Sequence, residues 1–195
     1  KPINLKKQMA NALSILSESI LRIPQGLFFN KNHTWAHLDY SGEAKVGLDD
    51  WLMHITGNVQ VNPLKTIGEK VSKGEPMIQL YQDDKQLMIA SPISGEIKKL
   101  NIQALEKPEL MAEDPYTQGW LYQIKPQNWV NETSSYYLAE EATEWSKQEL
   151  FKFKNFYLDY LSQGESKIPL AVMQEGGELV DHPLAHSSKE VWQSF

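Results

Sequence analysis

The chain has 195 residues, and none of them is cysteine. This absence excludes disulfides, thiolate metal sites, iron–sulfur ligation and a cysteine nucleophile, and it suits a reducing compartment. The sequence also lacks an apolar run long enough to span a membrane. We therefore expect a cytoplasmic location. Because the chain starts at Lys1 and not at methionine, it is open whether a preceding segment was removed.

Basic residues are also scarce. There are 19 Lys and Arg against 25 Asp and Glu, which gives a formal net charge of −6. Nucleic-acid binding and adhesion to an anionic membrane both need an excess of basic charge, so neither partner is expected. The sequence contains no Gly-rich phosphate loop and no Gly-x-Ser-x-Gly elbow either. We expect no catalytic group and no enzyme activity.

The middle of the chain is a succession of short strand patterns separated by turns. Strands this short, evenly spaced and punctuated by Gly and Pro, predict a β-rich sandwich or barrel. The expected strands cover residues 33–39, 43–48, 58–62, 77–82, 86–91, 93–100 and 121–125, and a loop is expected over 65–74. Asp49 is placed to cap a short helix over residues 50–55.

Helical patterns dominate the two ends. Apolar residues at spacings of three and four predict one helix over residues 3–21 and a longer one, with a broad aromatic face, over 135–161. A hairpin over 168–180 and a last short helix after Ser187-Ser188 are expected to follow. The chain thus divides into an N-terminal helix (1–23), a β domain (24–130) and a C-terminal extension (131–195).

Several motifs occur in a fixed order along the β-rich region. They are His33-Thr34-Trp35, Gly47-Leu48-Asp49-Asp50, and the stretches 57–63, 68–75, 90–97 and 113–121. With this set, residues 24–129 resemble the glycine cleavage system H protein. The resemblance implies an α+β fold, with a lipoyl-carrier-like barrel-sandwich core and flanking helices that include the long C-terminal one.

The resemblance also implies a carrier mechanism. In this family a lysine at the tip of a β-hairpin holds lipoyl as an amide. The dithiolane takes an aminomethyl group from a pyridoxal-phosphate decarboxylase, passes it to a folate-dependent transferase and is reoxidised by a flavoenzyme. The carrier presents the cofactor, and the cofactor does the chemistry.

The position of the family's lipoyl lysine is occupied by aspartate in this sequence. Counting forward from the loop residue Gly74 and back from Pro92 leads to Asp84 in both cases, with Lys85 one residue late. Asp84 cannot form the amide because that bond needs an amine. Tyr81 stands where the family has an acidic residue, and a shift by one residue reverses the direction of a side chain along a strand.

Two functions follow. In the first, the chain is a non-lipoylated scaffold or interaction module with no cofactor, which its terminal extensions favour. In the alternative, it is a lipoyl carrier modified on Lys85, acting in glycine cleavage or a related complex. Both have protein partners, such as glycine-cleavage-type or other multienzyme components, and the helical extensions could also mediate homo-oligomers.

No metal site is expected. His33 and His37 would lie about 13 Å apart on a strand, too far to share an ion. Pro183 separates His182 from His186. The adjacent carboxylates Asp49-Asp50 and Asp83-Asp84 would point in different directions, which is poor geometry for a carboxylate pair in catalysis.

Overall fold

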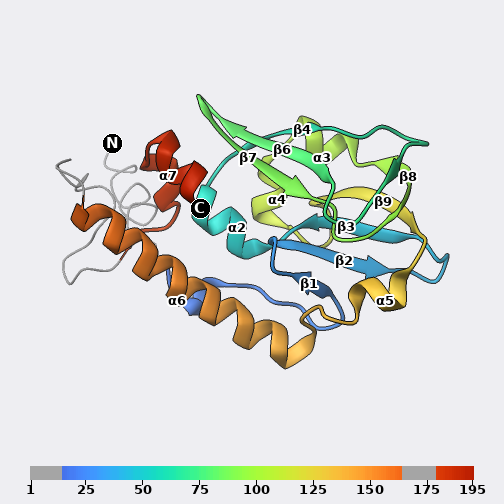
Figure 1. Cartoon of the computed structure of the whole chain (residues 1–195), viewed down its shortest axis with the longest axis horizontal. Helices are drawn as coiled ribbons and strands as arrows, with labels where there is room; N and C mark the ends of the chain where they lie inside the picture. The colour runs from blue at the N-terminus through green and yellow to red at the C-terminus, as the bar shows by residue number, and fades with distance from the viewer. Residues whose placement is uncertain (1–14, 164–178) are drawn as a thin grey trace, which may run out of the picture.

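The computed structural model describes residues 15–163 and 179–195 (Figure 1). Their strands form two antiparallel sheets, one in the order β1-β2-β3-β9-β8-β5 and one in the order β4-β6-β7. The strands are β1 (Phe28–Asn30), β2 (Thr34–Leu38), β3 (Ala44–Leu48), β4 (Gln60–Pro63), β5 (Lys70–Val71), β6 (Pro76–Gln82), β7 (Lys85–Ala90), β8 (Gly95–Leu100) and β9 (Trp120–Pro126). With the flanking helices they confirm the predicted α+β class, and a closed barrel is not observed among the described strands.

The two sheets share one hydrophobic core. In β3, Ala44, Val46 and Leu48 are buried at alternate positions, as expected for a strand with one face toward the interior. Strand β9 lies in the middle of the larger sheet, where Ile124 pairs with Ala44 on one side and with Ile97 on the other. Buried residues of β6 belong to the same apolar cluster, which joins the smaller sheet to the larger one.

The short helix α2 (Asp50–Thr56) begins where the sequence predicts. The Asp49 side chain accepts a hydrogen bond from the Leu52 backbone N–H at 2.8 Å, which satisfies one of the free donors of the first turn. The helix ends at Gly57, whose φ of 70° suits glycine. Most of α2 is buried, and its last turn carries His54 toward the C-terminal segment.

Three short α-helices and two short strands were not predicted from the sequence. The helices are α3 (Ile102–Glu106), α4 (Glu109–Glu113) and α5 (Trp129–Thr133), and the strands are β1 and β5. Each spans five residues or fewer, which is too short for a hydrophobic period to stand out. The expected loop over residues 65–74 therefore contains the two-residue strand β5.

The predicted long helix is present as α6 (Ala139–Gln163) but starts four residues later than expected. The backbone of Tyr137 exchanges hydrogen bonds of 2.9 Å with that of Phe29, so the chain is still extended there. Its predicted aromatic face is buried in part: Ala142, Trp145, Phe153 and Tyr157 lie in the core, whereas Leu138 and Tyr160 are exposed.

The predicted N-terminal helix is wrong over the part that the structure describes. Ile15 forms a β-bridge with Val180, and the Leu16 N–H donates to the Leu179 carbonyl at 2.9 Å. Only a single 3-10 turn, η1 (Glu18–Ile20), follows. This long-range pairing uses backbone groups that a helix would need. Residues 3–14, and residues 168–178 of the predicted hairpin, lie outside the described residues.

The C-terminal segment returns to α2 and strand β7. It contains a 3-10 helix, η2 (Pro183–His186), and the predicted last helix, α7 (Lys189–Ser194), which starts after Ser188. Helix α7 lies beside β7, near the tip of the β6–β7 hairpin (Figure 1). In the described ranges, none of the helices combines the length and the apolar character needed to cross a bilayer.

The glycine of the Pro92-x-x-Gly95 motif permits a close approach between strands. A Cβ atom on Gly95 would lie 2.3 Å from the Lys125 carbonyl oxygen of β9. We expect Gly95→Ala to lower the free energy of unfolding by about 3 kcal/mol, because the backbone has to move. Lys99→Ala, at an exposed position of the same strand, should change it by no more than about 0.5 kcal/mol. Urea denaturation of both variants tests this, and equal stabilities would contradict it.

Candidate functional site

The β6–β7 hairpin is the element on which this type of fold would present an attachment residue. Gln82 pairs with Lys85, so Asp83 and Asp84 form its two-residue turn. Asp83 has a φ of 54°, a left-handed conformation that aspartate tolerates better than most residues. Both aspartates are exposed. The tip of the hairpin therefore presents two carboxylates and no amine.

Lys85, the nearest lysine, is not part of the exposed tip. It is the first residue of β7 and is only 6% exposed. Its Nζ donates to the Ala185 carbonyl at 2.8 Å, lies 3.4 Å from the Leu184 carbonyl, and is 5.5 Å from the centre of the Trp192 ring. Carbonyl dipoles and an aromatic face thus compensate for the desolvation of its charge.

Residues 183–192, which include η2 and the first part of α7, lie over Lys85, and we call this segment the cover. Trp192 is 1% exposed, and its Nε1 donates to the Leu184 carbonyl at 2.8 Å. The Tyr157 hydroxyl of α6 donates to the Pro183 carbonyl at 3.2 Å and lies 2.7 Å from the Ser187 Oγ. The cover, residues 183–192, is therefore bound to the hairpin on one side and to α6 on the other.

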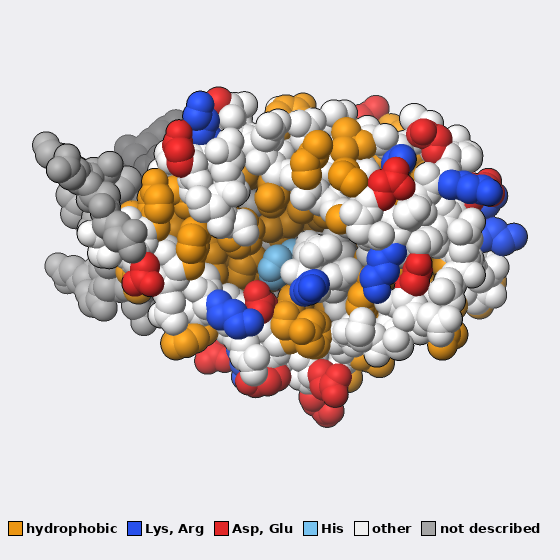
Figure 2. All heavy atoms as spheres, in the orientation of Figure 1, with side chains coloured by type: hydrophobic (Ala, Val, Ile, Leu, Met, Phe, Trp, Pro, Cys, Tyr) orange, Lys and Arg blue, Asp and Glu red, His pale blue; other side chains and the backbone are white. Residues whose placement is uncertain are grey.

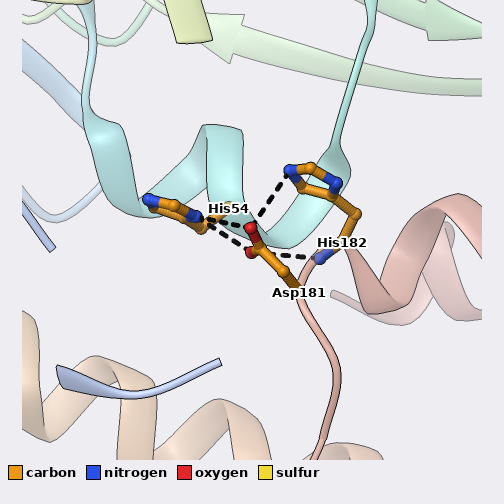
Figure 3. A group of neighbouring side chains, drawn as sticks. All are labelled: His54, Asp181 and His182. Atoms are coloured by element: carbon orange, nitrogen blue, oxygen red, sulfur yellow. Dashed lines mark hydrogen bonds and ion pairs between the residues drawn. The ribbon is translucent and has the colours of Figure 1, made fainter. Parts of the chain in front are cut away.

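A second group of polar side chains joins the cover to α2 (Figure 3). His54 Nδ1 lies 2.9 and 3.0 Å from the two carboxylate oxygens of Asp181, and His182 Nε2 lies 3.5 Å from Asp181 Oδ2. The His182 backbone N–H donates to the His54 carbonyl at 2.8 Å. Burial lowers the pKa of His54, but its hydrogen bonds to Asp181 and Asp50 outweigh this and raise the pKa to about 9.

The two adjacent carboxylates Asp49 and Asp50 make different structural contacts. Asp49 caps α2 and bonds to His33 at 3.0 Å, whereas the fully buried Asp50 accepts hydrogen bonds from Arg22 and lies 3.4 Å from His54 Nε2. Burial raises the pKa of Asp50, but these partners lower it below its usual value. The two carboxylates therefore serve different neighbours.

His33 and His37 are not brought together as ligands. His33 is buried and its ring stacks on Trp51 with 3.9 Å between centroids, whereas His37 is exposed on β2. His186 is exposed and does not join the cluster of His54, Asp181 and His182.

A cleft of about 380 Å³ lies beside the hairpin. Its lining includes His33, Leu52, Leu87, Met88 and Phe195. Figure 2 shows hydrophobic side chains gathered beside a histidine near the middle of the face that it draws. Met88 is 55% exposed, so this side of β7 offers apolar area to a partner.

The model of one protein family, described as "Glycine cleavage H-protein", matches residues 27–149, which is more than half of the chain. The chain belongs to this family. A Pyrococcus horikoshii relative described as "Probable glycine cleavage system H protein" is 30% identical over 126 residues, which are 65% of this chain and 93% of that protein. The Thermus thermophilus glycine cleavage system H protein is 33% identical over 106 residues, 54% of this chain and 82% of that protein.

A solved structure agrees with this family. The glycine cleavage system H protein of Mycobacterium marinum superposes with a TM-score of 0.53 at 27% identity, over 65% of this chain and 98% of that one. The family match ends within α6. The residues that cover Lys85 therefore lie outside the part of the chain that matches the H-protein family.

Sequence reasoning missed the cover and the histidine cluster for the same reason. His54 and Asp181 are 127 residues apart, and Lys85 and Ala185 are 100 apart. No periodicity or motif connects such positions. The adjacent pair Asp181-His182 offered two ligand types, but its partner His54 could not be named without the fold.

Proposed function

We propose that this chain is an H-protein-like interaction module that acts without lipoate in the state seen here. The observation that carries the proposal is the burial of Lys85 beneath residues 183–192, next to a hairpin tip occupied by Asp84. A lipoyl amide requires an accessible amine. The tip has the access but no amine, and Lys85 has the amine but no access.

The environment of Lys85 suits a structural anchor better than a cofactor site. Its ammonium is held by the Ala185 carbonyl and the Trp192 ring, groups that belong to the cover. To enter the active site of a lipoate ligase, Lys85 would have to leave both. The residues around Lys85 therefore do not fit a lipoyl group in this conformation, and we assign Lys85 the role of holding the cover on the β domain.

The partners that we propose are proteins, either glycine-cleavage-type components or members of another multienzyme complex, in the cytoplasm. The apolar side of β7 around Met88 and the cleft beside it support a docking role. In this function the chain contributes binding and positioning and no catalytic step of its own.

One observation favours the alternative, a lipoyl carrier modified on Lys85. Lys85 directly follows the turn, and what buries it belongs to a segment outside the family match. Release of residues 183–192 would expose the amine close to the tip. A partner or a ligase that displaces this segment would then find a lysine one position from the family site.

Intact mass spectrometry of the full chain distinguishes the two functions. The protein is purified from its native host grown with lipoate, alongside a glycine cleavage system H protein with lysine at the attachment position that is expressed in the same cells. We expect the second protein to carry the mass of one lipoyl group and this chain to have its unmodified mass. A lipoyl mass mapped to Lys85 would establish the carrier and overturn the proposal.

A further inference from the structure

We propose that His54, Asp181 and His182 form a binding site for Zn²⁺ at the junction between α2 and the C-terminal segment. One nitrogen from each histidine and one oxygen from the aspartate all lie within 4.8 Å of one another. The three side chains converge from two segments that are far apart in sequence (Figure 3). The inference does not depend on whether Lys85 is modified.

The distances are close to those of a zinc site. Tetrahedral coordination with bonds of about 2.0–2.1 Å places the ligand atoms about 3.3 Å apart. With Asp181 Oδ2 as the oxygen ligand, His54 Nδ1 lies 3.0 Å from it and His182 Nε2 lies 3.5 Å from it. The nitrogens of the two imidazoles lie within 4.8 Å of each other and have to approach to complete the site, and the His182 side chain is half-exposed.

The second nitrogen of His54 has the partner that a metal-binding histidine needs. His54 Nε2 lies 3.4 Å from the Asp50 carboxylate, which is itself held by Arg22. A carboxylate on the far nitrogen fixes the tautomer and the orientation of a metal-bound imidazole and increases its basicity. When Zn²⁺ binds, the proton on His54 Nδ1 leaves to solvent, and the metal replaces it as the link to Asp181.

The backbone holds the third ligand in position. His182 has a φ of 60°, a conformation that is uncommon for residues other than glycine, and its N–H bonds to the His54 carbonyl at 2.8 Å. Gly57 leaves room there, since a Cβ on it would lie 3.1 Å from the His182 Cβ. The His182 side chain is 44% exposed, which leaves a path for the ion and a position for a water ligand.

The ligand set determines the kind of ion. Two imidazoles and one carboxylate suit Zn²⁺ and related divalent transition metals, whereas Mg²⁺ and Ca²⁺ prefer all-oxygen ligands. Zn²⁺ at this site would connect α2 to the start of the cover, since Pro183, the first residue of the cover, follows His182 directly. The ion would hold the cover over Lys85 in the closed position.

The test is a zinc-binding titration on the full chain, free of any histidine tag, in competition with a chromophoric chelator. We expect one Zn²⁺ per chain. His182→Asn removes the ligand but keeps a residue that accepts a positive φ, so the fold is preserved. It should weaken Zn²⁺ binding by at least about 10–100-fold, the usual effect of disturbing a metal site. Asp181→Asn should act in the same direction.

His186→Asn is the matched control, because His186 is exposed in the same segment and lies outside the cluster. It should leave the affinity within about twofold, as expected for a residue that is not a ligand. Hydrogen exchange over residues 183–192 should slow when Zn²⁺ is added to the wild type and not when it is added to His182→Asn. Absence of stoichiometric binding, or equal affinity in wild type and a folded His182→Asn variant, would overturn the proposal.

Discussion

Tyr81→Glu combined with Asp84→Lys should turn this chain into a substrate for a lipoate ligase. The double variant places an amine at the exposed tip of the hairpin and restores the acidic residue that the H-protein family has three positions earlier. With lipoate, ATP and ligase, we expect modification to rise from undetectable in the wild type to the main species. Intact mass and peptide mapping to residue 84 provide the measurement.

Two controls make this outcome specific. Tyr81→Glu with Asp83→Lys offers an equally exposed lysine one residue away and should remain largely unmodified, because the ligase recognises a position in the hairpin. Adding Lys85→Arg to the first variant should leave the modification unchanged, which places it on residue 84. If the wild type is modified as fast as the double variant, the cover does not shield Lys85.

Trp192→Ala should have the largest effect on stability and should expose Lys85. Trp192 is 1% exposed, donates to the Leu184 carbonyl and packs against the Lys85 ammonium. Removing a buried tryptophan costs about 3–5 kcal/mol. We expect the loss to fall mainly on the cover, which can separate from the sheets. Hydrogen exchange over residues 183–192 measures the loss of stability in the cover, and denaturation of the whole chain measures the loss in the rest of the fold.

The exposure of Lys85 in this variant can be followed chemically. An amine-reactive reagent should label Lys85 slowly in the wild type and at a rate similar to that of the exposed Lys125 in Trp192→Ala. Trp192→Phe retains an aromatic ring but loses the hydrogen bond to Leu184, and should cost about 1 kcal/mol plus a small packing loss. Equal labelling of Lys85 in wild type and Trp192→Ala would contradict the cover.

The local elements of the β domain were predictable because their causes are local. Short strand patterns bounded by turn residues indicated β3 and β6, and Asp49 marked the start of α2 through a hydrogen bond made within four residues. The prediction failed where a distant partner changed the conformation. Residues 15 and 16 pair with residues 179 and 180, and a helical apolar spacing could not reveal that competition.

The strand boundary at the hairpin shows how much one residue matters. The sequence placed the second strand at residues 86–91, which left Lys85 in the turn, whereas β7 begins at Lys85. The register Gln82↔Lys85 gives the turn only Asp83 and Asp84. An amine that could have stood at the tip therefore starts a strand and faces the C-terminal segment.

By itself, the sequence determined the α+β class, the H-protein resemblance, and the replacement of the expected lysine by Asp84, because these depend on residue identity and short-range order. Only the tertiary structure decided that Lys85 is covered and that His54 meets Asp181 and His182. Both arrangements join segments about 100 residues or more apart. They depend on how the C-terminal segment packs against α2 and β7, a contact that no local pattern encodes.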